Sequence, residues 1–453
     1  MTATPTAPAQ AKFVEGSTMR HVITMTATGS IGLIAVFVVD VLNLLYISRL
    51  GRNELAAAVG YASTLMFFHT SVLIGLSIAV SATVSRAIGS GDRNLAKQYS
   101  ASSLYLIAAI SSLLTLLSYP LLELLLRLLG ARDETAALAA SFCRLLLPSV
   151  PLLGFGMATS ALLRAVGDGK RAMYITLGAA LATAALDPLF IFVFGLGLDG
   201  AAYANFCARL LMTIIGFWAV LRIHHLFAQP DRAVFQRGLQ AFAGIGIPAI
   251  LTNVATPFGN AAVTSAIAAY GDQAVAGWAV VSRLIPMAFA GLFALSGAVG
   301  PILGQNLGAK RYDRLRMTMR DSLSFSLIYV MLAWLLLALL SQAIARAFDA
   351  HGVAEDVIVF FCSFIAGSFI FNGCLFVANA AFNNLGFPFY STLLNWGRAT
   401  IGVIPFVYFG GKWFGSRGVM TGYGLGVVVF GVLGVWLCFR VLNQIEQRQQ
   451  KQS

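Results

Sequence analysis

The sequence contains few charged residues. Asp, Glu, Lys and Arg together make up 11% of its 453 residues, whereas a typical soluble domain has about 25%. Apolar residues account for 58%, and the mean hydropathy is +0.81. A soluble core cannot bury that much apolar surface. Because apolar stretches long enough to cross a bilayer recur along the chain, the sequence predicts an all-α polytopic membrane protein.

Motifs of reactive chemistry are also missing. The five cysteines fall inside predicted helices without CxxC or CxH spacing, which argues against a disulfide or metal framework. The sequence has no Gly-x-Ser-x-Gly or His-Glu-x-x-His motif, so an intramembrane protease or lipid transferase is disfavoured. A channel is disfavoured because no filter signal is present. We expect a transporter rather than an enzyme, with no cofactor beyond H+ or Na+ as the coupling ion.

Twelve apolar stretches are predicted to span the membrane: residues 21–48, 54–85, 100–127, 135–163, 172–196, 200–223, 240–269, 274–305, 321–347, 355–383, 389–411 and 418–441. The first is too long for the apolar core of a signal peptide and lacks a cleavage site, so we expect a retained helix. The residues before it are rich in Ala, Thr and Pro and are predicted to be a disordered tail.

The net charge of +12 follows the membrane topology. With these spans, nineteen Lys and Arg residues lie on the side that holds both termini, and seven lie on the other. Because positive loops stay in the cytoplasm, both termini are predicted to be cytoplasmic, in a cell inner membrane. The basic charge therefore does not indicate nucleic-acid binding, and the expected partners are the bilayer and small organic molecules, with the protein a monomer.

The chain aligns with itself at a shift of about 219 residues, which matches Gly89 with Gly308 and Gly167 with Gly386. Each half holds six spans, an even number, so we expect two lobes related by a pseudo-two-fold axis along the membrane normal. The predicted parts are a disordered tail (1–16), an N-lobe (17–223), a cytoplasmic linker (224–239), a C-lobe (240–442) and a C-terminal tail (443–453).

Three segments resemble the MATE (multidrug and toxic compound extrusion) transporters, and within them the DinF-like branch. They are residues 39–51 (Val-Asp-Val-Leu-Asn-Leu-Leu-Tyr-Ile-Ser-Arg-Leu-Gly), 186–202, which begin Leu-Asp-Pro, and 304–309 (Gly-Gln-Asn-Leu-Gly-Ala). The resemblance implies the MATE fold and an outward-directed antiporter with a substrate cleft between two lobes. It also implies coupling to H+ or Na+, in this branch through the acid of the first helix. Flippases for lipid-linked oligosaccharides belong to the same superfamily and remain an alternative, as does Na+ coupling.

Of the 18 acidic residues, Asp40 and Asp187 lie deep in predicted spans. An isolated carboxylate is costly in hydrocarbon, so such a group is neutral when dry and ionised when wet. A conformational change can then switch its charge, as a proton carrier requires. Both acids lie in the first half, and Asn260 stands at the position that matches Asp40 in the second. We therefore expect the cation to couple through the N-lobe.

Polar side chains accompany the two acids. Asn43, Thr183 and Asn205 are predicted to orient the carboxylates and to form the cation-coupling site with them. The branch commonly has Asn at the place of Thr183 and Thr at the place of Asn205, so these two types are exchanged here. The first helix also lacks the family's proline, for which Gly29 and Gly32 are softer substitutes.

A static role for Asp40 is the competing interpretation. Four arginines lie within predicted spans and are candidate ion-pair partners, with Arg209 considered first: Arg144, Arg209, Arg283 and Arg398. Coupling is favoured over static pairing. The predicted function is proton-coupled efflux of amphipathic, often cationic, organic compounds, and the candidate substrate-cleft residues are Phe155, Phe258, Asn260 and Phe289.

Overall fold

The computed structural model describes residues 11–49 and 53–450. Residues 1–10 of the predicted tail, and Gly51 of the first resembling segment, lie outside the described residues. The described chain is helical, with no strand in these two ranges. This is the all-α architecture that a bilayer imposes, because a helix satisfies its own backbone hydrogen bonds.

The helices of the first half are α1 (Thr18–Ser48), α2 (Asn53–Gly89), α3 (Arg93–Leu128), α4 (Asp133–Leu146), η1 (Leu147–Ser149), α5 (Val150–Ala165), α6 (Gly169–Pro188), η2 (Leu189–Val193), α7 (Gly197–Trp218) and η3 (Ala219–Ile223). The helices of the second half are α8 (Arg232–Ala268), α9 (Asp272–Ala288), α10 (Ala290–Gly308), α11 (Tyr312–Ala347), α12 (Val353–Phe360), η4 (Phe361–Ile365), η5 (Ala366–Ser368), α13 (Phe369–Leu385), α14 (Pro388–Gly397), η6 (Arg398–Gly402) and α15 (Ile404–Gln450).

Ten helical segments of the described chain are long and apolar enough to cross a membrane, and α9 and α10, bent by 43°, form an eleventh. The last segment contains two spans. Its α15 has 47 residues, about 70 Å at 1.5 Å per residue, which is more than twice a bilayer core. α15 breaks at Phe414 and Gly415, where Gly415 has a φ of 62°. The described residues thus contain the twelve predicted transmembrane helices.

The predicted repeat is visible in the helix boundaries. α3 and α11 begin at Arg93 and Tyr312, and α5 and α13 begin at Val150 and Phe369, which reproduces the shift of about 219 residues. Both α5 and α13 follow a short 3₁₀ turn, η1 or η5, at the same position of the repeat. The two halves therefore share a 3₁₀ turn within the fourth membrane span of each half.

The chain forms two compact units whose limits differ from the predicted lobes. Unit 1 contains residues 1–17, 31–246 and 301–314, and unit 2 contains residues 18–30, 247–300 and 315–453. The start of α1 thus belongs to unit 2, and the start of α8 and the α10–α11 connection belong to unit 1. The predicted linker is also shorter, because α8 begins at Arg232, and the predicted C-terminal tail is helical to Gln450.

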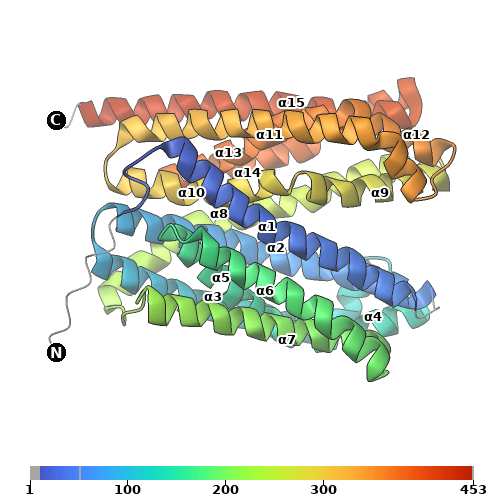
Figure 1. Cartoon of the computed structure of the whole chain (residues 1–453), viewed down its shortest axis with the longest axis horizontal. Coiled ribbons are helices and arrows are strands. Elements are labelled where there is room, and N and C mark those ends of the chain that lie inside the picture. The colour runs from blue at the N-terminus through green and yellow to red at the C-terminus, as the bar shows by residue number, and fades with distance from the viewer. Residues whose placement is uncertain (1–10, 50–52, 451–453) are drawn as a thin grey trace. The chain divides into compact units, whose positions relative to one another are not determined.

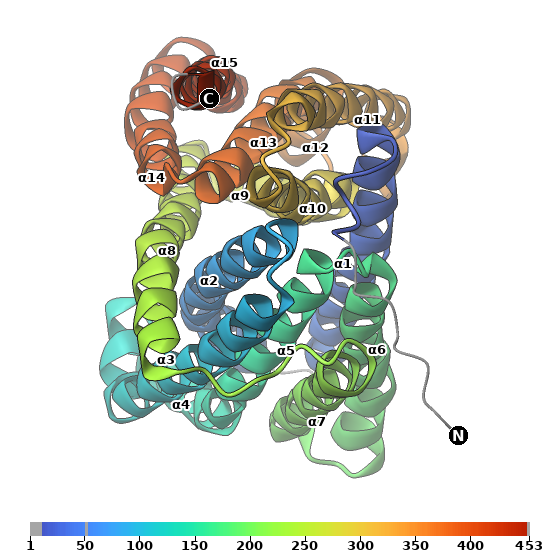
Figure 2. The same ribbon diagram turned by 90° about the vertical axis from the view of Figure 1, so that its left-hand side faces the viewer.

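In unit 1, α5 packs against α2, α3, α6 and α7 (Figures 1 and 2). Its glycines permit this close approach, since a Cβ on Gly156 would lie 2.6 Å from the sulfur of Met212 on α7. In unit 2, α13 packs against α14 and α15, and α9 packs against α12 (Figure 2). α13 thus takes the place in unit 2 that α5 takes in unit 1.

The two glycines matched by the repeat meet within unit 1. A Cβ on Gly89 would collide with the backbone of Gln305, and a Cβ on Gly308 would collide with the backbone of Arg86. The repeat also matches Arg86 with Gln305, so the contacts are reciprocal. Reciprocal contacts of this kind are the signature of a two-fold axis. The matched glycines therefore make equivalent close contacts where the ends of α2 and α10 cross.

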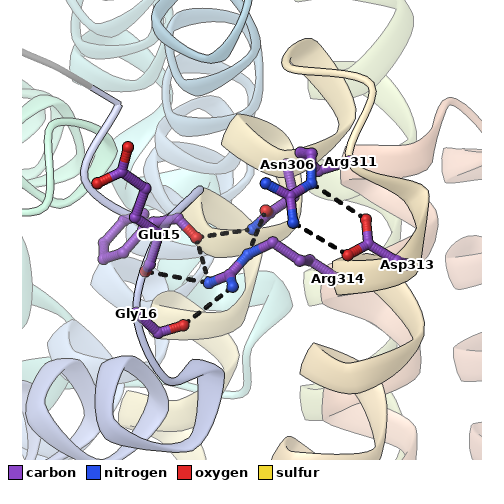
Figure 3. A network of polar contacts seen from close by, with 7 residues as sticks. Glu15, Gly16, Asn306, Arg311, Asp313 and Arg314 are labelled. Carbon is purple, nitrogen blue, oxygen red and sulfur yellow. Dashed lines mark hydrogen bonds and ion pairs between the residues drawn. The ribbon is translucent and has the colours of Figure 1, made fainter.

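Residues 12–16, here called the N-terminal strap, are bound next to this crossing (Figure 3). The backbone N–H of Phe13 donates to Oε1 of Gln305 at 2.9 Å, and its carbonyl accepts from Nη2 of Arg314 at 2.9 Å and Nδ2 of Asn306 at 3.2 Å. Arg314 also donates to the carbonyls of Glu15 and Gly16. The phenyl ring of Phe13 is buried. The strap is ordered, which differs from the predicted disordered tail.

The strap also binds the turn between α5 and α6. Nζ of Lys12 donates to the carbonyl of Gly167 at 2.9 Å, and Nε2 of Gln305 donates to the carbonyl of Ala165 at 2.7 Å. Gly167 has a φ of 83°, which a glycine adopts without strain. The family-like segment 304–309 therefore connects three parts of unit 1 that are far apart in the sequence.

Asp168 caps the N-terminus of α6. Its carboxylate accepts from the backbone N–H of Arg171 at 3.1 Å, from the guanidinium of Arg171, and from Nε2 of His224 at 2.8 Å. Burial would raise the pKa of the Asp168 carboxyl, but the hydrogen bonds from His224 and Arg171 outweigh it and hold that pKa well below its ordinary value. The cap thus links α6 to the end of η3.

Candidate functional site

The two deep carboxylates lie on neighbouring helices of unit 1. Asp40 is on α1 and Asp187 is at the end of α6, directly before Pro188 and the π-helical turn η2. Nδ2 of Asn43 on α1 donates to Oδ2 of Asp187 at 2.9 Å. Asp40 lies three residues before Asn43, on the same helix. α1 and α6 therefore bring together three predicted coupling residues.

The two acids differ in their surroundings. The side chain of Asp187 is completely buried, and its Oδ1 has no hydrogen-bond partner among the described residues. The side chain of Asp40 is exposed. An unpaired buried carboxylate oxygen is costly when charged, and this is the feature that separates Asp187 from Asp40.

The other two predicted coupling residues bind elsewhere. Thr183 donates to the carbonyl of Ala179, one turn back in α6, and Asn205 donates to the carbonyl of Ala201, one turn back in α7. Neither side chain is hydrogen-bonded to a carboxylate. A small polar side chain in a helix can always reach its own i−4 carbonyl, and sequence spacing does not reveal which bond it chooses.

Arg209 is not the ion-pair partner of Asp40. Its Nη1 donates to the hydroxyl of Ser149 at 2.7 Å. Arg144 pairs with Glu123 at 2.7 Å. Within the described ranges, no ion pair joins Asp40 or Asp187 to an arginine. The static ion-pair interpretation therefore has no support in the structure.

The candidate substrate-cleft residues lie in different surroundings. Phe155 packs beside Phe217 in unit 1, with ring centroids 5.2 Å apart. In unit 2, Phe258 is half-exposed, and Asn260 is exposed. Phe289 is completely buried, so it belongs to the core of unit 2. The other three stay predictions.

Sequence analysis missed a polar cluster in unit 2. Arg398 on η6 is buried, with Tyr423 of α15 and Asn372 of α13 around it. The sequence marks Arg398 as a candidate partner for Asp40 and as one of four intramembrane arginines that fit a flippase, and the other two residues carry no signal by spacing alone. Its position in the middle of an apolar span could have marked it as a site of its own.

The family-model comparison agrees with the fold and the repeat. The MatE model matches residues 30–189 and 248–409, most of the chain, in two ranges offset by about 219 residues. The chain belongs to the MATE family. It is therefore a multi-pass membrane transporter, and the repeat that the family model detects is the one seen in the sequence.

Curated MATE-like relatives match nearly the whole chain. A protein named FAD transporter from Shewanella oneidensis is 26% identical over 436 residues, 94% of this chain and 96% of its own length. The probable multidrug resistance protein YpnP of Bacillus subtilis is 25% identical over 437 residues, 94% of this chain and 96% of its own. The multidrug export protein MepA of Staphylococcus aureus is 23% identical and covers 86% of each chain.

Solved structures of MATE transporters have the same fold. A mutant of the Vibrio cholerae MATE transporter VcmN superposes with a TM-score of 0.89 at 24% identity, over 95% of this chain and 97% of its own. A MOP superfamily transporter from Pyrococcus furiosus, described as having a binding pocket of reverse polarity, superposes with a TM-score of 0.90 at 19% identity, over 98% and 99%. These likenesses show that this MATE chain has the twelve-helix, two-lobe fold.

Proposed function

We propose that this MATE transporter is a proton-coupled antiporter of the DinF-like branch that exports amphipathic, often cationic, organic compounds. In this proposal it lies in the cell inner membrane as a monomer, with both termini in the cytoplasm. The names of its relatives, multidrug proteins and a FAD transporter, support an organic small molecule as the substrate. The observation that carries the coupling is the pair Asp40 and Asp187, which has no arginine partner in the described chain.

Protonation would act on the contact between α1 and α6. Asn43 stabilises the charged form of Asp187 by donating to it, so a proton on Asp187 weakens this bond. The exposed Asp40 takes up the proton first, and the mutual repulsion of two carboxylates favours sharing it. A conformation in which α1 moves relative to α6 is then favoured, and the equilibrium between inward and outward access shifts.

The test is dye efflux from proteoliposomes under an imposed pH gradient or an imposed Na+ gradient. We expect wild type to respond to the pH gradient, and Asp40→Asn and Asp187→Asn to lose this response while they still bind the dye. Asp199→Asn is the matched control, because Asp199 is an exposed acid at the start of α7 in the same unit. Its efflux should equal that of wild type.

The outcomes separate the alternatives. Efflux driven only by the Na+ gradient would indicate that Na+, and not H+, is the coupling ion at the same site. Unchanged efflux in both mutants would contradict coupling through these acids. If wild type moves no dye under either gradient, drug antiport fails and flipping of a lipid-linked precursor becomes the stronger candidate.

A further inference from the structure

Arg398 places a guanidinium inside the membrane-spanning part of unit 2. It begins η6 in the middle of the predicted span 389–411, and its side chain is 6% exposed. Over residues 11–49 and 53–450, no ion pair joins it to a carboxylate, and its Nε has no hydrogen-bond partner. A buried charge normally requires a partner. The chain supplies none here.

The neighbours of Arg398 are polar but uncharged. The phenol of Tyr423 lies beside Arg398 and Asn372, and both neighbours are buried. A guanidinium has five N–H donors, so a single phenol leaves most of them without an acceptor. Oδ1 of Asn372 also lacks a partner in the described chain, which leaves one acceptor for a hydroxyl or N–H group of a ligand. The cluster has a positive charge and lacks an anion.

A row of buried amides leads to this cluster. Asn379 lies two helical turns beyond Asn372 on α13, and Asn395 lies three residues before Arg398 on α14. Nδ2 of Asn395 donates to Oδ1 of Asn379 at 3.0 Å. Polar side chains in a transmembrane bundle hydrogen-bond across helices. This bond therefore joins α13 to α14 close in sequence to Arg398.

Aromatic side chains surround the other side of Tyr423. The ring of Trp278 lies 6.0 Å from it and the ring of Phe369 lies 6.5 Å from it, centroid to centroid. Both are buried in unit 2. The cluster thus places one fork-shaped cation near buried aromatic rings. A carboxylate, sulfonate or phosphate group fits the guanidinium fork, and the aromatic rings of a solute would stack favourably on such side chains.

We propose that unit 2 contains an oxyanion-binding site, centred on Arg398 with Tyr423 and Asn372, which takes the acidic group of an amphipathic aromatic solute. As the site of a transported solute, it rests on the proposed export function and adds aromatic acids and zwitterions to the substrate class. It does not depend on the acids of unit 1.

The test uses rhodamine B and its ethyl ester, which differ by one free carboxylate. Binding to the purified protein in nanodiscs of zwitterionic lipid is measured by fluorescence polarisation, with empty nanodiscs subtracted. We expect wild type to bind the acid at least about tenfold more tightly than the ester, as expected for a hydrogen-bonded charge. Arg398→Gln should remove this preference, and Arg398→Lys, which keeps the charge but not the fork, should keep part of it.

Controls address folding and the source of the anion. Binding of the ester at wild-type affinity shows that Arg398→Gln is folded, and Arg144→Gln, which removes an arginine paired with Glu123, should keep the preference for the acid. If phosphatidylglycerol in the nanodiscs abolishes that preference in wild type, a lipid phosphate occupies the site and the solute assignment is wrong.

Two results would overturn the proposal: equal affinities of wild type for acid and ester, or an unchanged preference in both Arg398 variants. A failure of the proposed export function would give a different set of results. Asp40→Asn should bind both dyes as wild type does and transport neither, so normal transport by Asp40→Asn would refute proton coupling while the preference for the acid would still stand.

Discussion

The two halves of the chain have the same helices but differ in the charged residues at matching positions within them. Asp40 and Asp187 are in the first half, where the repeat places Asn260 and an apolar run in the second. Arg398 is in the second half, where the first has Ala179. The equivalent helices α6 and α14 both lead into a π-helical turn, but α6 runs for 20 residues before it and α14 for 10.

The helical architecture is a requirement of the bilayer, whereas the polar side chains within the spans are a matter of function. The bilayer fixes the spacing of helices, because every backbone polar group must be satisfied within the span. It leaves the few buried polar side chains free to differ. π-Helical turns often mark functional positions. Of the four in the described chain, η2 begins two residues after Asp187 and η6 begins at Arg398. One frame thus carries different polar side chains in its two halves.

The largest expected effect tests whether proton coupling requires an acid in the first half, or whether an acid at the matching position of the second half can replace it. Asp40→Asn should reduce pH-driven dye efflux to the level of empty liposomes, because no titratable group remains to exchange with Asp187. Adding Asn260→Asp should not restore it, since residue 260 has no counterpart of Asn43 and Asp187. Restored efflux in the double mutant would mean that the two halves are interchangeable.

The next effect tests the reciprocal contacts of Gly89 and Gly308, where α2 and α10 cross. Gly89→Ala and Gly308→Ala should each destabilise the protein by upwards of about 3 kcal/mol, because each Cβ meets backbone rather than a movable side chain. Thermal unfolding in detergent measures this. Gly60→Ala is the control, since a Cβ there meets nothing within 4 Å. A large difference between the two glycine mutants would break the two-fold interpretation.

A smaller effect concerns the N-terminal strap, which has no counterpart in the second half. Arg314→Ala should cost about 2 kcal/mol, because it leaves the strap carbonyls of Phe13, Glu15 and Gly16 without this buried donor. Limited proteolysis should then cut within the strap. Arg311→Ala is the matched control, because Arg311 pairs on the surface with Asp313 (Figure 3). Equal sensitivity of both mutants would show that the strap bonds contribute nothing.

The smallest effect is that of the cap on α6, whose counterpart at the start of α14 has no acid. Asp168→Asn should cost about 1 kcal/mol at neutral pH, because Asn keeps the cap but loses the negative charge that strengthens the hydrogen bonds from Arg171 and His224. Because the folded-state pKa of Asp168 is depressed, its contribution is present above about pH 4 and is lost as the pH falls further. Stability of wild type and mutant should therefore converge at low pH, and a constant difference would contradict this.

The sequence allowed the twelve spans and the repeat to be predicted, because both depend on hydropathy and spacing. It also singled out Asp40, Asp187 and Asn43, since deep polar residues are rare in apolar helices. The bonds of Thr183 and Asn205 were not predictable, because a short side chain has its own helix carbonyl as a competing partner. Those choices depend on how neighbouring helices rotate, which composition does not encode.

The strap and the Arg398 cluster were missed for different reasons. The strap is short, with only Phe13 and Val14 as large apolar residues, and its order comes from partners about 300 residues away, such as Arg314. Phe13 is the sole aromatic residue in the first 17 and was the available signal. Arg398 was visible in the sequence, but its neighbours Tyr423 and Asn372 come from separate helices. Long-range pairing of this kind is set by tertiary packing.

The strap also bears on the order in which the protein is made. Phe13 leaves the ribosome first, yet its partners Gln305 and Arg314 follow 292 and 301 residues later. During synthesis Lys12 can reach the carbonyl of Gly167 after four spans, but the backbone of Phe13 has neither of these two partners until eight spans have been produced. The contacts of Phe13 with Gln305 and Arg314 therefore form late in folding. A bulky group fused close to Lys12 would interfere with one of the last steps of assembly rather than the first.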